Sequence, residues 1–123
     1  MIILLDHIQL AMPEKEEDKA RAFYSEVLGL VEIDKPSTLQ GRGGVWYQIA
    51  NDRQVHLGVE KPFSPNRKAH PCFVVDDLDR LAKVLQAEGY PVTWDEALYP
   101  VRRFYTEDCF ANRLEFVDRA TCM

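Results

Sequence analysis

Hydrophobic and polar positions follow two different periods in the first half of the chain. Residues 3–11 (ILLDHIQLA) are rich in β-forming residues and predict a strand. After Pro13 the apolar residues recur at helical spacing as far as Gly29, a residue type that commonly ends a helix. Further strands are predicted over 30–33, 45–49 and 54–59. The first half therefore predicts the order βαβββ.

The same order begins again after a stretch with two prolines, KPFSPNRK, which predicts a linker over residues 61–68. A strand is expected over 69–75, followed by a helix that begins after Asp76 or Asp77 and ends at Gly89. Three more strands are predicted over 92–94, 101–106 and 113–117. The second half thus repeats the order βαβββ.

Corresponding positions of the two halves lie about 60 residues apart, as His7 and His70 do, and likewise Gly29 and Gly89. Such a constant offset indicates an internal duplication. We therefore expect a single α+β domain over residues 1–123, built from two tandem βαβββ modules. The expected bounds are about 1–60 for module 1, 61–68 for the linker and 69–123 for module 2.

Four of the predicted strands each carry one residue that can bind a metal, on the face opposite their apolar side chains. These residues are His7, His56, His70 and Glu115. A single histidine in a strand is more often a hydrogen-bonded structural residue, but three at equivalent positions of a repeat favour a shared metal site. Three imidazoles and a carboxylate suit Zn, Ni, Co, Fe(II) or Mn, whereas Ca²⁺ and Mg²⁺ prefer oxygen ligands alone.

Other side chains on these strands are candidates for binding substrate. Trp46 and Gln48 share one face of their strand, and Arg103 and Tyr105 share one face of theirs. The guanidinium of Arg103 is suited to a carboxylate or phosphate group, although a solvated surface arginine explains the position too. Trp46 is explained equally well as a platform for substrate and as a core or dimer-contact residue.

Composition and charge restrict the classes of function. With 46% hydrophobic and 28% charged residues the chain is typical of a soluble globular protein. Its net charge of -5 argues against nucleic acid and anionic membranes as partners and favours a small molecule. The three cysteines form no CxxC pair, which fits a reducing cytoplasm. No apolar stretch approaches the about 20 residues of a membrane-spanning helix.

Five segments of the sequence resemble the vicinal oxygen chelate superfamily: LDHIQLA, ARAFYSEVLGL, QVHLGVE, AHPCFVVDDLDRL and TEDCFANRLEFVD. This superfamily includes glyoxalase I, bleomycin-resistance proteins, fosfomycin-resistance enzymes, extradiol dioxygenases and methylmalonyl-CoA epimerase. The resemblance implies a cup-shaped mixed sheet with the helices outside, one divalent metal per site, and association as a homodimer. The four ligand positions of the superfamily match His7, His56, His70 and Glu115.

The sequence departs from the superfamily pattern at two places. Glyoxalase I enzymes usually carry a glutamate where this chain has His56, and that glutamate takes part in proton transfer. The DPxGN turn before the last strand is replaced by DCFAN at residues 108–112. Extradiol dioxygenases and fosfomycin enzymes use two histidines and one carboxylate, whereas this chain offers a fourth candidate ligand. No subfamily is matched throughout.

The resemblance favours a glyoxalase-like, metal-dependent lyase or isomerase acting on a small substrate that chelates through oxygens. The metal acts there as a Lewis acid, and Glu115 or His56 is expected to serve as the catalytic base. An extradiol-type dioxygenase and a non-catalytic binding protein of the bleomycin-resistance kind are the alternatives. The sequence leaves open whether the four ligands come from one chain or from two chains of a dimer.

Overall fold

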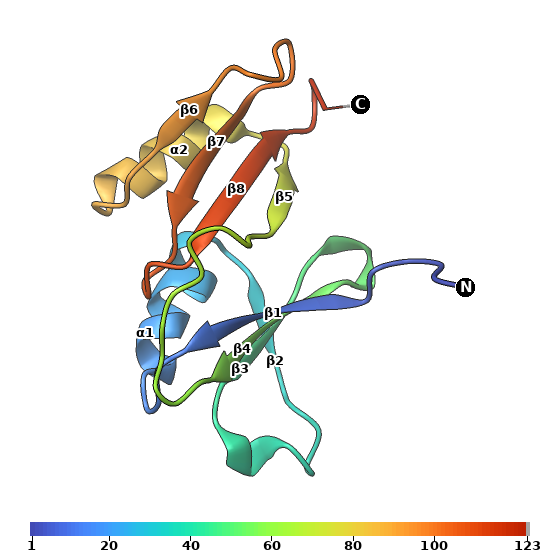
Figure 1. The fold of residues 1–123 in the computed structure, drawn as a ribbon, viewed down its shortest axis with the longest axis vertical. Coiled ribbons are helices and arrows are strands. Elements are labelled where there is room, and N and C mark those ends of the chain that lie inside the picture. Colours follow the sequence, from blue (N-terminus) through green and yellow to red (C-terminus); the bar gives the residue numbers. More distant parts are fainter. Residues whose placement is uncertain (123) are drawn as a thin grey trace. The chain divides into compact units, whose positions relative to one another are not determined.

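The computed structural model describes residues 1–122, with Asn51 described by its backbone alone (Figure 1). The chain divides into two compact units, Met1–Pro65 and a second unit that begins at Asn66, inside the predicted linker. Each unit consists of one four-stranded mixed sheet and one main helix. None of the helices within residues 1–122 has the length and apolar character needed to span a bilayer.

The first unit contains the predicted βαβββ order. Its elements are β1 (His7–Met12), α1 (Glu17–Arg21), the π-helix η1 (Ala22–Val27), β2 (Val31–Ile33), the 3₁₀ turn η2 (Gln40–Arg42), β3 (Val45–Gln48), the 3₁₀ turn η3 (Ala50–Asp52) and β4 (Gln54–Val59). The sheet order is β1-β4-β3-β2, with β1 parallel to β4 and the other pairs antiparallel. β4 therefore lies between β1 and β3.

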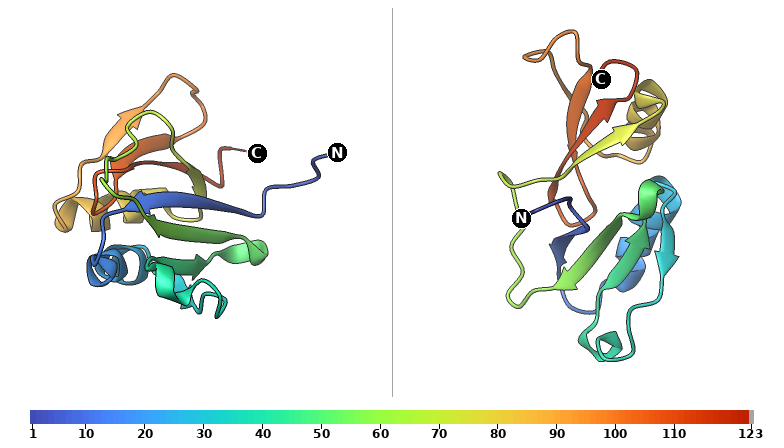
Figure 2. Two further views of the ribbon diagram at one scale, coloured as in Figure 1. Left: turned by 60° about the horizontal axis from the view of Figure 1, so that its bottom comes forward. Right: turned by 90° about the vertical axis from the view of Figure 1, so that its right-hand side faces the viewer.

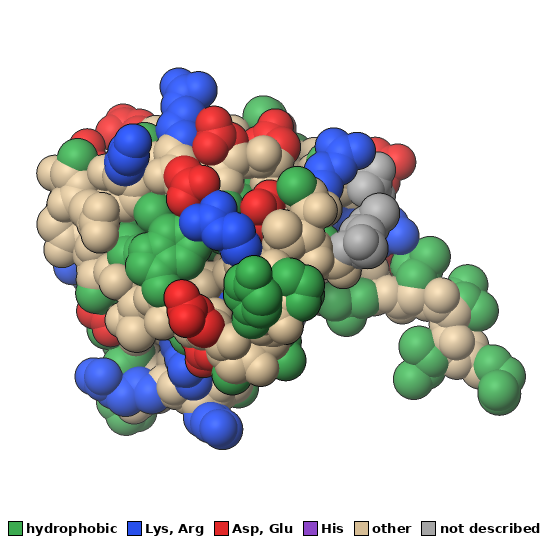
Figure 3. All heavy atoms as spheres, turned by 90° about the horizontal axis from the view of Figure 1, so that it is seen from above, with side chains coloured by type: hydrophobic (Ala, Val, Ile, Leu, Met, Phe, Trp, Pro, Cys, Tyr) green, Lys and Arg blue, Asp and Glu red, His purple; other side chains and the backbone are tan. Residues whose placement is uncertain are grey.

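The first strand is shorter than the sequence predicts. It begins at His7 rather than at residue 3, and the apolar side chains of residues 1–5 are exposed along the N-terminal segment (Figure 3). The neighbouring strand explains the difference, because β4 begins at Gln54, the register partner of His7. Within the described sheet, residues 3–5 therefore have no strand beside them to pair with.

The first helix combines two hydrogen-bond patterns, α-helical over Glu17–Arg21 and π-helical over Ala22–Val27. The helix ends at Val27, and Gly29, the predicted terminating residue, follows the C-cap Leu28 with a φ of 73° in the left-handed region. The amide of Leu30 donates to the carbonyl of Tyr24 at 2.9 Å, which closes the helix end.

The second unit repeats the order βαβββ. Its elements are β5 (Cys72–Val75), α2 (Leu78–Ala87), β6 (Thr93–Asp95), β7 (Arg103–Glu107) and β8 (Arg113–Asp118). The sheet order is β5-β8-β7-β6, with β5 parallel to β8. Of the two predicted caps, Asp77 is the one used, since its Oδ1 accepts a hydrogen bond from the Arg80 amide at 3.1 Å. Two tandem α+β modules are thus confirmed.

Each unit buries one face of its sheet against its own helix (Figure 2). The side chains buried in this way alternate along the strands, as the sequence predicts. In the first unit they are Leu10, Met12, Tyr47, Val55 and Leu57, with Phe23 and Tyr24 from the helix. In the second they are Phe104, Leu114 and Phe116, with Leu78 and Leu85 from the helix. The opposite face of each sheet carries the candidate site residues.

The turn between β7 and β8 contains a residue under backbone strain. Ala111 has a φ of 66°, which is a left-handed conformation that costs an L-residue about 1–2 kcal/mol. We therefore expect Ala111→Gly to raise the free energy of unfolding by about 0.5–1 kcal/mol in urea titrations, because glycine relieves the strain at some entropic cost. The control is Ala120→Gly at an exposed turn position, where the same change should be neutral or destabilising. An equal effect at both positions would contradict the assignment of strain to Ala111.

Candidate metal centre

In the first unit, His7 and His56 lie together on the face of the sheet opposite the helix. Their ring centroids are 4.2 Å apart and their planes differ by 21°. Trp46 lies opposite His56 in the register of β3 and β4, and stacks on it with centroids 3.7 Å apart and planes within 2°. Because β4 lies between the other two strands, the ring of His56 has His7 on one side and Trp46 on the other.

The surroundings of His56 keep its ring neutral. The residue is 4% exposed, and this burial, together with the neighbouring His7, lowers the pKa of His56 to about 4. Its Nε2 lies 2.8 Å from Oε1 of Gln54. Since an amide oxygen accepts, Nε2 donates and Nδ1 is left with the lone pair that a metal requires. Gln54 thus orients a predicted ligand.

His7 is held in a comparable way by its chain neighbour. Its Nδ1 donates to Oδ2 of Asp6 at 2.9 Å, which leaves Nε2 as the ring nitrogen able to bind a metal. The side chain is 44% exposed, so this nitrogen is more accessible than those of His56. The first unit therefore provides two oriented imidazoles.

In the second unit, His70 and Glu115 form the other predicted pair. Nε2 of His70 lies 2.9 Å from Oε1 of Glu115, and both side chains are largely buried. His70 precedes β5 by two residues instead of lying inside a strand, and its Nδ1 donates to the carbonyl of Lys68 at 2.8 Å. A backbone carbonyl that binds the far nitrogen is the usual partner of a metal-binding histidine.

The distance between these two atoms fits a pair of adjacent metal ligands. Bonds of about 2.0–2.2 Å from nitrogen and oxygen to one ion place neighbouring ligand atoms about 3 Å apart. Nε2 of His70 and Oε1 of Glu115 already have this separation, and they point at each other. A divalent ion would replace the proton that joins them.

The second oxygen of Glu115 is bound by Arg103. Nη1 of Arg103 donates to Oε2 of Glu115 at 3.0 Å and to the hydroxyl of Tyr105 at 2.7 Å, while Nη2 pairs with Asp95 at 3.2 Å. Burial acts to raise the pKa of Glu115, but the hydrogen bonds from His70 and Arg103 outweigh it and hold that pKa below its ordinary value. Glu115 is therefore ionised, as a metal ligand must be.

The remaining predicted site residues lie close to these pairs. Tyr105 is the register partner of Glu115, and its ring centroid is 5.4 Å from that of His70. Gln48 lies two residues from Trp46 on the same strand face, and its amide donates to the carbonyls of Ile49 and Arg53 at 3.0 and 3.2 Å. Contact of these side chains with a substrate stays a prediction.

Sequence reasoning missed several groups that orient the ligands: the amide of Gln54, the Lys68 carbonyl and the carboxylate of Asp95. Alternation along β4 places Gln54 on the same face as His56, so this partner could have been predicted from the sequence. The other two depend on the path of the chain before β5 and on the register of β6, which no local pattern reveals.

The four predicted ligands are brought together as two pairs, one in each unit. Across residues 1–122 no set of three or more histidine, cysteine, aspartate or glutamate side chains is placed to hold a metal ion. The pairs match in one respect: each histidine has one ring nitrogen hydrogen-bonded to an oxygen that is not a predicted ligand, and its second nitrogen is the one that could bind a metal.

Residues 4–116 match the sequence model of the Glyoxalase/Bleomycin resistance protein/Dioxygenase superfamily. The chain belongs to this superfamily. The resemblance found in the sequence is thereby confirmed, although no subfamily is assigned. No curated protein matches the chain. The superfamily includes glyoxalases, fosfomycin-resistance proteins and dioxygenases, and it is generally metal-dependent.

Solved structures of superfamily proteins share the fold. A glyoxalase family protein from Bacillus anthracis is 42% identical, with 96% of each chain covered and a TM-score of 0.91. Lactoylglutathione lyase from Agrobacterium tumefaciens is 20% identical, covering 94% of this chain and 93% of its own, with a TM-score of 0.72. A fosfomycin resistance protein from Listeria monocytogenes is 16% identical, covering 96% and 94%, with a TM-score of 0.73. The last two show likeness of fold alone.

Proposed function

We propose that the chain is a glyoxalase-like metal-dependent enzyme, a lyase or isomerase that acts on a small substrate chelating through two oxygens. One divalent ion (Zn, Ni, Co, Fe or Mn) would be bound by His7, His56, His70 and Glu115, from one chain or from two chains of a homodimer. The observation that carries the proposal is the His70–Glu115 pair, whose facing Nε2 and Oε1 atoms are 2.9 Å apart. The Lys68 carbonyl fixes the histidine in that orientation.

When bound, the ion would act as a Lewis acid that stabilises negative charge on the substrate oxygens. The chain itself would supply the base that removes a proton from substrate carbon. Glu115 is ionised, and its pKa is lowered by the hydrogen bonds from His70 and Arg103 despite burial. His56 is neutral because burial lowers its pKa to about 4. Both groups can therefore accept a proton at neutral pH.

The two candidate bases are distinguished by substrate proton exchange. Glu115→Gln and His56→Gln would each be assayed for exchange at substrate carbon in deuterated buffer, with hemithioacetals as the first substrates and acyl-CoA esters as the second. We expect exchange to be lost in the variant that lacks the base and kept in the other. Unchanged exchange in both variants would contradict a role for either group.

Metal content is the direct test of the site. Purified protein should contain about one divalent ion per site, and His7→Ala and His70→Ala should each lower metal affinity by at least about tenfold. Asp76→Asn, at an exposed position with no hydrogen bond to either pair, is the control and should leave metal content unchanged. Wild-type metal content in both histidine variants would overturn the proposal.

The identity of the metal separates the alternatives. Bound iron with oxygen uptake on catechols would instead assign an extradiol-type dioxygenase. Ligand binding by a protein that takes up no metal would assign a non-catalytic binding protein of the bleomycin-resistance kind. Nickel, cobalt or zinc with turnover of a hemithioacetal is the expected result.

A further inference from the structure

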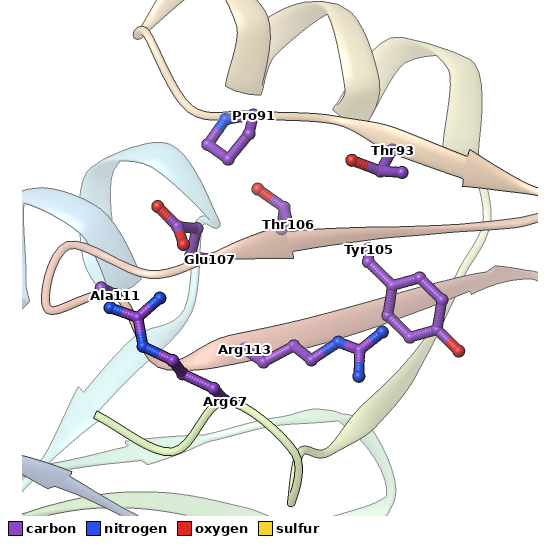
Figure 4. Close-up of a pocket in the computed structure, with 8 residues that line it drawn as sticks. All are labelled: Arg67, Pro91, Thr93, Tyr105, Thr106, Glu107, Ala111 and Arg113. Carbon is purple, nitrogen blue, oxygen red and sulfur yellow. The ribbon is translucent and has the colours of Figure 1, made fainter. Parts of the chain in front are cut away.

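The second unit contains a pocket of about 360 Å³ on its sheet, at the end where β7 leads into β8 (Figure 4). The residues that line it are Arg67, Pro91, Thr93, Tyr105, Thr106, Glu107, Ala111 and Arg113. Its volume is within the range of about 300–1,000 Å³ that is typical of small-molecule sites.

The pocket lies on the same face of the sheet as Glu115. In the register of the sheet, Tyr105 is the direct partner of both Thr93 and Glu115, and Glu107 is the partner of Arg113. Residues two apart on a strand share a face, so these side chains all project to one side. Tyr105 thus belongs to the pocket wall and also contacts the His70–Glu115 pair.

Two arginines are built into the pocket from separate segments of the chain. The amide of Arg113 donates to the carbonyl of Asn66 at 2.9 Å, and the amide of Asn66 donates to Oδ1 of Asn112 at 3.1 Å. These bonds fix the backbone next to Arg67 alongside the start of β8. Arg67 and Arg113 are therefore brought to the wall of one pocket (Figure 4).

Neither guanidinium is neutralised by the protein. Among residues 1–122, no acidic side chain lies within 4.0 Å of the guanidinium of Arg67 or Arg113, whereas Arg103 in the same unit has two such partners. Glu107 is the register partner of Arg113, yet the guanidinium of Arg113 lies over the ring of Tyr105 instead, 4.0 Å from its centroid. The positive charge therefore remains available to a ligand.

We propose that this pocket binds the oxyanion of a small molecule, a carboxylate or a phosphate group, through the guanidinium of Arg113, with Arg67 as a second positively charged group of the same pocket. Guanidinium groups bind both oxyanions through paired hydrogen bonds. Glu107, the acidic residue of the pocket, would accept a hydrogen bond from a hydroxyl or amino group of the same molecule. Insofar as the proposed function holds, the molecule is the substrate, with its oxyanion anchored here and its chelating oxygens near His70 and Glu115.

The test uses metal-free, desalted protein, so that its outcome does not depend on the metal site. Inorganic phosphate and L-lactate are titrated calorimetrically at constant ionic strength, as probes for the two oxyanions. We expect one of them to bind with one site per chain, and Arg113→Gln to weaken binding by about tenfold or more. Arg80→Gln removes the same charge from an exposed position of α2 and should change binding less than twofold.

Binding of phosphate alone assigns phosphorylated ligands, and binding of lactate alone assigns carboxylates. The proposal is overturned if neither anion binds wild type, or if Arg80→Gln weakens binding as much as Arg113→Gln. Loss of metal in His70→Ala with anion binding intact would show that the two sites are independent.

Discussion

Replacing Asp108 by alanine is expected to lower the free energy of unfolding by about 3–5 kcal/mol, because three donors lose a buried charged acceptor. Asp108 is 3% exposed. Its Oδ1 accepts from the amides of Phe110 and Asn112 at 2.8 and 2.9 Å, and its Oδ2 accepts from the side-chain amide of Asn112 at 3.0 Å. Alanine would leave these groups unpaired in the turn between β7 and β8.

The effect of this change should reach the candidate site. Oδ1 of Asn112 binds the amide of Asn66, which lies four residues before His70, so the turn also anchors the segment that leads to that histidine. Urea unfolding of Asp108→Ala should therefore be accompanied by weaker metal binding. Asp76→Ala, at an exposed aspartate, is the control and should stay within about 0.5 kcal/mol of wild type. Equal stability of the two variants would contradict the role of the turn.

The fold was predictable because its signals are local and occur twice. Alternation in β4 and β8 sorts each strand into a helix-facing side and an opposite side, and Gly29 and Gly89 follow the two helix ends with φ values of 73° and 87°. The start of β1 was not predictable in this way. Residues 3–5 are as β-prone as the strand itself, and only the point where β4 begins decides that they remain unpaired.

The sequence predicted which residues belong to the candidate site, but it did not predict the contacts between them. Alternation places His56 and Glu115 on the sheet faces opposite the helices, where the structure has them, although both side chains are buried there. Alternation does not predict that the guanidinium of Arg103 forms ion pairs with Asp95 and Glu115, because those pairs depend on the register of three strands. The unpaired arginines, Arg67 and Arg113, become recognisable only once every ion pair in the unit is known.

Replacing Arg103 by methionine is expected to weaken metal binding by about 10–100-fold, the usual effect of removing a group that orients a metal ligand. Arg103 holds Oε2 of Glu115 at 3.0 Å, so that Oε1 alone faces His70. Its own position is fixed by Asp95 and by the hydroxyl of Tyr105. Without the guanidinium, the largely buried carboxylate loses one of the two hydrogen bonds that keep it ionised and in place.

The absorption spectrum of the cobalt-substituted protein distinguishes a changed geometry at the metal site from a general loss of stability in Arg103→Met. The visible absorption of bound Co(II) should shift in Arg103→Met, because Glu115 becomes free to rotate or to bind through both oxygens. Arg103→Lys should restore affinity only in part, since an ammonium group cannot hold Glu115, Asp95 and Tyr105 together in a fixed geometry. Arg102→Met is the matched control, because this adjacent arginine pairs with Asp79 at 2.8 Å and does not touch Glu115. If both methionine variants bind cobalt with the affinity and spectrum of wild type, Arg103 does not position the ligand.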